Sequence, residues 1–510
     1  MMLLMLITKF LGFIREILLG QQFGTSYQTD AYIVALTVPT IVFGSVMAAI
    51  STSFIPIYSK VRHKDGIKRA NYFTNNLLSI VIIISIILAS IGFFVSKYIV
   101  HILGKGLSQE GINLAVDLTN ISLLMLITLG IISILTAYLQ AHENFLVPSF
   151  VNIPIIITVI FSLFMVDYIG IKGVMYANII GSIIQVLILL YFTLKLTRFK
   201  FIVDLKDKDF KELIYLIIPV FIATSVQQIN LLVDKMLASS FGDGYISALT
   251  FGNKINEMFF GLISVTIATF IFPKLADLAT KNSMQEFDDL VRTSLNTVSL
   301  LVLPLVFIVL LFSNELVKLL FERGEFDSSS TSLTADALFY FSFGMLFFGF
   351  RDVLNRTFYS LGDTKSPMKN AIVTVITNII LSLILMQWMG YKGLALSYSL
   401  AGIVTCLMLF TALNKKVKSF NYLQFGVDQL KILIACTIMI VMSWITFHFI
   451  LKSNQDNNLI LMINLGSSII LGFIIYIFML KVLKLKEINE IFYIIKKRIQ
   501  RENKKENING

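Results

Sequence analysis

The chain has 510 residues, of which 56% are hydrophobic and only 14% are charged, and its formal net charge is +11. Soluble globular proteins carry about a quarter charged residues, so this composition cannot supply the water-facing surface of several soluble domains. It also excludes a disordered chain, a coiled coil and a secreted disulfide-rich scaffold. Together with a mean hydropathy of +0.81, it indicates an all-α polytopic membrane protein.

Segments of about 20 apolar residues are long enough to cross a bilayer as helices, and the sequence contains fourteen of them. No hydrophilic segment exceeds roughly 25 residues, which leaves no room for a soluble catalytic domain, so we expect a protein that is not an enzyme. The predicted spans are 1–22, 30–58, 77–101, 113–140, 147–167, 173–194, 213–238, 246–273, 293–313, 334–358, 368–389, 393–413, 430–451 and 459–480.

The positive charge is distributed unevenly between the two sets of connecting segments. One set, which includes the tail from Lys481, holds 29 of the 42 Lys and Arg residues, whereas the opposite set holds seven. Positively charged loops stay in the cytoplasm, so we expect both termini on the cytoplasmic side. The net charge is therefore a topology signal, and we expect no nucleic-acid partner.

Side chains that usually hold metals or cofactors are few. Cys406 and Cys436 lie in apolar runs and are interpreted as small core residues, and the four histidines show no ligand spacing. The nucleotide-binding pattern G-x-x-x-x-G-K-[ST] does not occur. We expect no resident cofactor, and transport driven by an ion gradient, the membrane potential or removal of product.

The two halves of the chain resemble each other at an offset of 217–220 residues. Phe23-Gly24 matches Phe241-Gly242, and 168–173 matches 388–393. The offset spans six predicted helices, an even number, so the halves share one orientation. Two such six-helix lobes, related by a parallel internal repeat, are typical of transporters. We predict an N-terminal lobe at 1–200, a C-terminal lobe at 201–420, an added helix pair at 421–483 and a basic cytoplasmic tail at 484–510.

Apolar residues in the tail recur at helical spacing among basic ones, from Ile488 to Ile499. The pattern is typical of a basic amphipathic helix lying on the anionic inner leaflet. A solvated tail explains it equally well.

Ionisable residues inside the predicted spans are the main functional signal. A charge in hydrocarbon costs at least ~2.5 kcal/mol, so such a side chain should face protein or a water-filled cavity. We predict a cationic cavity suited to an anionic headgroup, since a pyrophosphate accepts several charge-assisted hydrogen bonds. The alternative is that the charges pair and hold helices together. The candidate substrate-binding residues are Lys9, Arg15, Glu16, Asp30, Lys254 and Glu257. In addition, Gln227, Asn230 and Asp234 form a polar stripe on one helix.

A series of closely spaced motifs comprises 8–16, Phe23-Gly24, 29–32, Pro39 and 53–56, and a further one lies at 358–367. These motifs resemble the MurJ/MviN family of the multidrug/oligosaccharidyl-lipid/polysaccharide exporter superfamily. The resemblance covers essentially the whole chain.

The resemblance implies a flippase that moves lipid II, a peptidoglycan precursor, from the inner to the outer leaflet of the bacterial cytoplasmic membrane for cell-wall biosynthesis. It implies alternating access, with the headgroup of an undecaprenyl-pyrophosphate-linked glycan bound in the cationic cavity. The helix pair at 421–483 would form a groove for the polyprenyl tail and contact membrane lipids. Cell-wall synthases are further candidate partners.

Several positions depart from the family pattern. Lys9 and Lys254 stand where the family has arginine, and Phe43 replaces another arginine. Lysine keeps the charge but loses the bidentate fork. The departures favour an alternative, an exporter of another undecaprenyl-linked glycan such as a capsule or teichoic precursor. A further alternative is a non-transporting membrane scaffold of cell-wall synthesis.

Some family members have a sodium site in the second lobe. Asp234 and Asn378 match that pattern, while Ser382 replaces its second carboxylate. The resemblance therefore implies Na+ as a candidate coupling ion.

Overall fold

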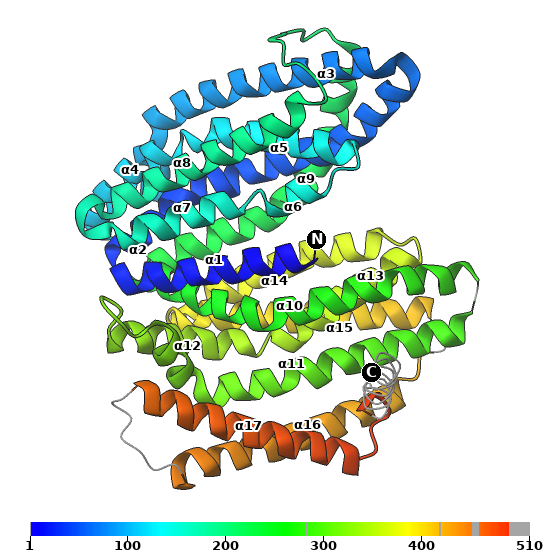
Figure 1. The fold of residues 1–510 in the computed structure, drawn as a ribbon. Helices are drawn as coiled ribbons and strands as arrows, with labels where there is room; N and C mark the ends of the chain where they lie inside the picture. Colours follow the sequence, from blue (N-terminus) through cyan, green and yellow to red (C-terminus); the bar gives the residue numbers. More distant parts are fainter. Residues whose placement is uncertain (1, 282, 418–419, 451–457, 489–510) are drawn as a thin grey trace, which may run out of the picture. The chain divides into compact units, whose positions relative to one another are not determined.

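The computed structural model describes residues 2–281, 283–417, 420–450 and 458–488, and no strand occurs among them. The predicted amphipathic tail lies outside the described residues from position 489 on. In chain order (Figure 1), the helices are α1 (Met2–Phe23), α2 (Tyr27–Thr37), the π-helix η1 (Val38–Val42), α3 (Phe43–Leu103), α4 (Gln109–Ser122), α5 (Met125–Ala141), α6 (Leu146–Phe150), α7 (Ile153–Phe164), α8 (Val166–Leu194), α9 (Lys208–Ser239), α10 (Tyr245–Thr280), α11 (Met284–Phe321), α12 (Ser328–Ser342), α13 (Met345–Ser360), α14 (Lys365–Met389), α15 (Lys392–Lys416), α16 (Tyr422–Ile445), the π-helix η2 (Thr446–Ile450) and α17 (Asn458–Val482).

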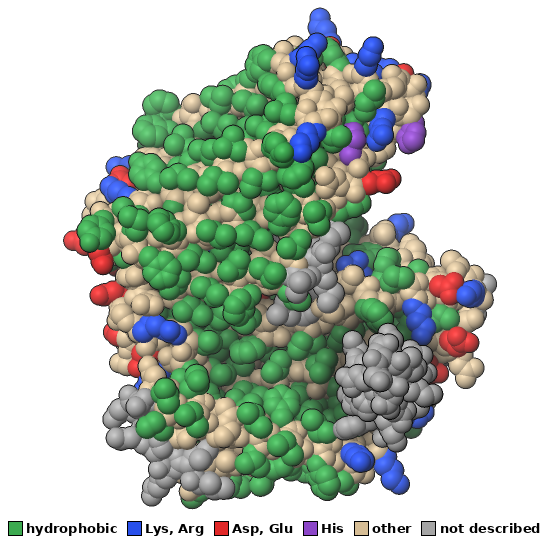
Figure 2. All heavy atoms as spheres, viewed as in Figure 1, with side chains coloured by type: hydrophobic (Ala, Val, Ile, Leu, Met, Phe, Trp, Pro, Cys, Tyr) green, Lys and Arg blue, Asp and Glu red, His purple; other side chains and the backbone are tan. Residues whose placement is uncertain are grey.

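Nine helices in the described part of the chain are long and apolar enough to cross a membrane, or twelve when each of three bent helix pairs counts as one span. The all-α, multi-pass membrane fold is thereby confirmed, whereas the count of fourteen spans stays a prediction. Hydrophobic side chains cover most of the helix sides visible in Figure 2, as expected of surfaces that face lipid.

The chain divides into two compact units. Unit 1 comprises Met1–Lys254, Phe321–Thr334 and Val375–Leu394, and unit 2 comprises Ile255–Leu320, Ala335–Thr374 and Ala395–Gly510. The lobe boundaries at residues 200 and 420 stay a prediction.

Local geometry recurs at the offset read from the sequence. Gly24 and Gly242 both have positive φ, +58° and +109°, and Gly170 and Gly390 have +59° and +61°. These are backbone conformations that glycine adopts without steric cost. The helix pairs α4–α5 and α12–α13 bend by 43° and 44° at matching breaks. The internal repeat therefore exists in the backbone as well as in the sequence.

The polar segment 59–76, predicted as the connection between two spans, is helical except at one residue. It lies within α3, where Gly66 has φ 81° and ψ 170°. Lys and Arg are good helix formers, so the segment continues both flanking helices until the glycine breaks them. The rings of Phe54 and Phe73 stack with centroids 5.6 Å apart from opposite sides of the break. The chain therefore reverses direction at Gly66.

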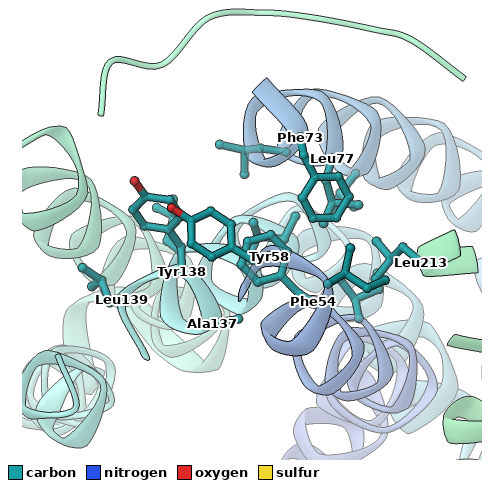
Figure 3. Packing of buried hydrophobic residues seen from close by; sticks show 14 of the residues in the cluster. Phe54, Tyr58, Phe73, Leu77, Ala137, Tyr138, Leu139 and Leu213 are labelled. Atoms are coloured by element: carbon teal, nitrogen blue, oxygen red, sulfur yellow. The ribbon is translucent and has the colours of Figure 1, made fainter. Parts of the chain in front are cut away.

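The core of unit 1 is centred on this reversal (Figure 3). Phe54 also stacks on Tyr58, with centroids 5.4 Å apart, and Tyr58 meets the ring edge of Tyr138 from α5 at 5.2 Å. Leu213 from α9 belongs to the same cluster and is fully buried. Long-range contacts between buried side chains thus join α3, α5 and α9.

In unit 2, α16 and α17 pack against α11. The hydroxyl of Tyr476 donates a hydrogen bond of 2.9 Å to the carbonyl of Leu300, and Cys436 is buried in the same cluster. Cys406 is buried too, and neither cysteine forms a disulfide. Their interpretation as small core residues is confirmed.

Candidate functional site

Asp30 holds the N-terminal end of α10. Its carboxylate accepts the backbone N–H of Gly244 at 2.6 Å and that of Ser247 at 2.7 Å, and its side chain is fully buried. The N-terminus of a helix carries unpaired N–H groups and a partial positive charge. Asp30 therefore satisfies two donors and the helix dipole, and in this conformation both of its oxygens are occupied by α10.

The end of α1 meets the segment that precedes α12, close to the same place. The Glu325 backbone N–H donates to the Gln21 carbonyl at 2.9 Å, and Thr25 Oγ1 donates to Ser330 Oγ at 2.8 Å. A Cβ at Gly24 would lie 2.3 Å from the Glu325 carbonyl oxygen. This end of unit 1 is therefore closed by backbone contacts that tolerate no side chain at Gly24.

Arg15 and Glu16 form an ion pair with each other on α1. The Arg15 side chain keeps 29% of its surface exposed, whereas that of Glu16 keeps 9%. Both residues act electrostatically on Tyr32 of α2, whose hydroxyl accepts a hydrogen bond of 2.9 Å from Asn178 Nδ2. Arg15 therefore remains accessible to a ligand while its partner carboxylate anchors it.

Lys235 on α9 is a further cation at this site. Its Nζ donates a hydrogen bond of 2.8 Å to Thr37 Oγ1, and it lies within electrostatic range of Lys254 and Glu16. The sequence analysis missed Lys235, although the rule that ionisable residues inside spans mark sites applies to it equally. Residues from α1, α2, α9 and the start of α10 thus meet in unit 1.

Most of the remaining predicted residues lie apart from this cluster. Lys9 is exposed on α1, on one helical face with Glu16 but about 10 Å along the axis from it. Phe43 is half-buried at the start of α3. Glu257 is exposed and belongs to unit 2, whereas Lys254 is half-buried, belongs to unit 1 and lies within electrostatic range of Lys235 in the cluster.

Asp234 on α9 and Asn378 on α14 lie together, as the resemblance to the family implied. Asn378 Nδ2 donates to both carboxylate oxygens of Asp234 at 3.2 Å and to Asn230 Oδ1 at 3.0 Å. Asn230 Nδ2 in turn donates to Asp234 at 3.2 Å. Two members of the polar stripe on α9 therefore form one hydrogen-bonded group with α14.

The oxygen chemistry of this group fits a hard monovalent or divalent cation. The side-chain oxygen Oδ1 of Asn378 is buried and accepts no hydrogen bond, and hard cations take carboxylate and amide oxygens as ligands. Within the described residues, however, no cluster of three His, Cys, Asp or Glu side chains suits a metal. The group therefore fits a weakly held ion with one carboxylate ligand better than a tightly bound divalent one.

The cations of unit 1 are arranged for an anion. Arg15 pairs with Glu16, and Lys235 lies within electrostatic range of both Glu16 and Lys254. Charge-assisted hydrogen bonds to phosphate oxygens are about twice as strong as neutral ones. These cations therefore offer charge-assisted donors to an anion.

A family model described as lipid II flippase MurJ matches residues 19–482. The probable lipid II flippase MurJ of Rickettsia prowazekii (strain Madrid E) is 29% identical over 484 residues, which are 92% of this chain and 94% of the relative. That of Buchnera aphidicola subsp. Baizongia pistaciae (strain Bp) is 27% identical over 465 residues, covering 88% and 89% of the two chains.

A solved structure of lipid II flippase MurJ in an inward closed conformation matches with a TM-score of 0.79 and 25% identity, covering 94% of this chain and 97% of that one. An inward-facing multidrug resistance MATE family transporter of the MOP superfamily matches with a TM-score of 0.64 and 14% identity, covering 81% of this chain and 95% of that one, which shows a shared fold alone. By the extent of the family match, this chain belongs to the lipid II flippase MurJ family.

Proposed function

We propose that this protein moves lipid II from the inner to the outer leaflet of the bacterial cytoplasmic membrane by alternating access. The observation that carries the proposal is the match of the lipid II flippase family over residues 19–482. The fold agrees with it, because the matched solved structure is a flippase in one named state of a transport cycle. The substrate is then a lipid-linked glycan precursor of peptidoglycan.

The cations of unit 1 would hold the pyrophosphate of that substrate. Arg15 is the only arginine among them, and its guanidinium can bind a phosphate through two parallel hydrogen bonds, whereas Lys235 and Lys254 act as point charges. The headgroup would therefore be oriented by Arg15 and neutralised by the lysines. Lys9, Asp30 and Glu257 remain candidate substrate contacts of other conformations.

The orientation follows from charge. The segments that hold most of the Lys and Arg residues would face the cytoplasm, together with both termini. The helix pair α16–α17 would carry the polyprenyl tail, because its outer sides are apolar and exposed at Leu430, Ile470 and Phe478. Cell-wall synthases would consume the substrate on the far side.

We also propose that Na+ binds at Asp234 and Asn378 and couples to transport. The support is the hydrogen-bonded oxygen group on α9 and α14 and its unsatisfied amide oxygen. Neutral substitution at Asp234 should then abolish any effect of sodium on the protein.

The test of the flippase proposal is rescue of a bacterium depleted of its own flippase, with lipid II counted in the outer leaflet. Wild type is compared with Arg15→Ala and Lys254→Ala at equal membrane expression. Lys97→Ala is the matched control, because Lys97 is an exposed lysine outside the site. We expect rescue by wild type and by the control, and loss of rescue in both site variants.

Other outcomes are equally informative. Rescue by all variants would retain the function and refute the headgroup site. Failure of well-expressed wild type, with export of a capsule or teichoic precursor instead, would support the alternative that Lys9, Lys254 and Phe43 suggest. If the protein exports no lipid-linked glycan, the remaining interpretation is a non-transporting scaffold of cell-wall synthesis.

A further inference from the structure

The connection between α8 and α9, residues 195–207, forms neither helix nor strand and lies against the second half of α3. Asn76 of α3 exchanges two hydrogen bonds with the backbone of Asp204, at 2.8 and 2.7 Å. Ser79 Oγ accepts the backbone N–H of Ile202 at 3.1 Å. The connection is therefore held by named contacts at defined heights along α3.

The heights of these contacts can be placed relative to the membrane. Between Arg69 and Lys97, α3 carries no charged residue. A hydrocarbon core needs about 20 helical residues, so counting back from Lys97 sets its cytoplasmic boundary close to Asn76 and Ser79. The 195–207 connection therefore runs at the level where lipid headgroups meet acyl chains.

Side-chain exposure alternates along residues 201–205 of the connection. Ile202 and Asp204 are half-buried, and the Asp204 carboxylate accepts a hydrogen bond from Tyr72 of α3. The odd-numbered residues from 199 to 205 are apolar and exposed. Their exposed fractions are 41% for Phe199, 65% for Phe201, 48% for Val203 and 61% for Leu205.

The exposed charges of the same segment are all positive. Its half-buried acid, Asp204, accepts the Tyr72 hydroxyl at 3.3 Å, and the buried Asp207 pairs with Arg69. One of the basic side chains, Lys195, lies over the ring of Tyr191 at 4.1 Å. The exposed basic residues are Lys195, Arg198, Lys200 and Lys206. Lys, Arg and His side chains gather at this end of unit 1 in Figure 2.

We propose that the 195–207 connection is a binding site for anionic lipids of the inner leaflet. The four exposed apolar side chains enter the acyl boundary, and the four basic side chains bind lipid phosphates. A row of exposed apolar residues marks a site of membrane or protein interaction, and basic residues beside it are attracted to an anionic leaflet. The proposal rests on the orientation given above and not on the identity of the transported lipid.

The first test uses the full-length protein in nanodiscs of phosphatidylcholine and phosphatidylglycerol. Phe201→Trp is made in a background in which Trp388 and Trp444 are replaced by Phe, and its fluorescence is quenched with brominated lipid or with aqueous acrylamide. Lys64→Trp in the same background is the control, because Lys64 is exposed beyond Arg69, outside the uncharged part of α3. We expect the indole introduced at position 201 to be quenched by the lipid and protected from acrylamide, and the indole introduced at position 64 to behave in the opposite way.

The second test measures preference for phosphatidylglycerol over phosphatidylcholine with spin-labelled lipids. Arg198→Gln/Lys200→Gln should lower that preference roughly thirtyfold, given ~1 kcal/mol per basic residue near a membrane surface. Lys64→Gln/Lys68→Gln removes the same charge and should change it little. The proposal is overturned if acrylamide quenches the Phe201→Trp variant as strongly as the Lys64→Trp variant, or if protection at position 201 requires an added protein. It is also overturned if both charge variants change the lipid preference equally.

Discussion

Asp30 Oδ1 accepts the backbone N–H of Ser247 at 2.7 Å, from a residue 217 positions further along the chain. The separation equals the lower end of the repeat offset, so the two residues occupy equivalent places in the two halves. The N-terminal half supplies the carboxylate, and the C-terminal half supplies the helix N-terminus that the carboxylate satisfies. The carboxylate in the first half thus caps the helix that begins at the equivalent place in the second half.

Replacing Asp30 with Asn should destabilise the protein. The two backbone N–H groups bind different carboxylate oxygens, and in Asn one of these becomes an NH2 donor, which leaves one N–H unpaired. A buried donor left unpaired costs about 1–3 kcal/mol. Thermal unfolding in detergent should show a clear fall in Tm. Asp117→Asn is the control, because its ion pair with Lys172 is solvent-exposed and worth about 1 kcal/mol at most. Equal shifts for the two variants would refute the capping role.

Gly24→Ala should disrupt the protein more than Gly170→Ala. Both glycines have φ near +60°, but a Cβ at Gly24 would meet the Glu325 carbonyl oxygen at 2.3 Å, whereas nothing lies within 4 Å at Gly170. The strained φ alone costs about 1–2 kcal/mol. Membrane expression and Tm should be measured for both variants. Similar losses of expression and Tm would show that backbone strain at positive φ explains the whole effect.

Lys235→Gln should reduce lipid II flipping severalfold or more, and Lys235→Arg should retain most of it. The reason is that the positive charge beside Lys254 and Glu16, rather than the shape of the side chain, would attract the headgroup. The flippase-depleted strain described above is the assay. Normal lipid II flipping by Lys235→Gln would show that Lys235 does not belong to the headgroup site.

Sodium should stabilise wild type against heat relative to choline at equal ionic strength. A ligand that binds only the folded protein adds RT ln(1 + [L]/Kd) to stability, about 2.7 kcal/mol at a hundred times Kd. Asp234→Asn should abolish the sodium-dependent rise in Tm. Asp243→Asn serves as control, because Asp243 is exposed and lies outside the hydrogen-bonded group of α9 and α14. A sodium effect that survives Asp234→Asn would rule out this site.

Asp363 should contribute stability that disappears in acid. Burial opposes its charged form, yet hydrogen bonds from Lys416 and Ser366 lower the pKa of Asp363 below its ordinary value. Lys416 Nζ lies 2.7 Å from the carboxylate. A lowered folded-state pKa means stability that is present above about pH 4, the unfolded value, and lost below it.

Asp363→Asn should therefore lower Tm at pH 7, and the difference from wild type should shrink as pH falls below about 4. Melting curves of both proteins between neutral and acid pH provide the measurement. A difference that stays constant across that range would contradict the role of ionised Asp363.

Much of the fold was predictable because bilayer crossing depends on local composition. The repeat was predictable because Gly170 and Gly390 need the same left-handed backbone, and only glycine adopts it without steric cost. The sequence predicted 59–76 as the connection between two spans, and the structure added that the connection is helical up to the break at Gly66.

By itself, the sequence determined the membrane class, the helical architecture, the internal repeat and which helices carry ionisable residues. Each of these properties can be read from the composition and order of neighbouring residues. Only the tertiary structure decided which partners those residues find. It placed Asp30 on the end of α10, and it placed Lys235 beside Thr37, 198 positions away. Such contacts depend on the rotation and packing of whole helices, and no local pattern in the chain encodes them.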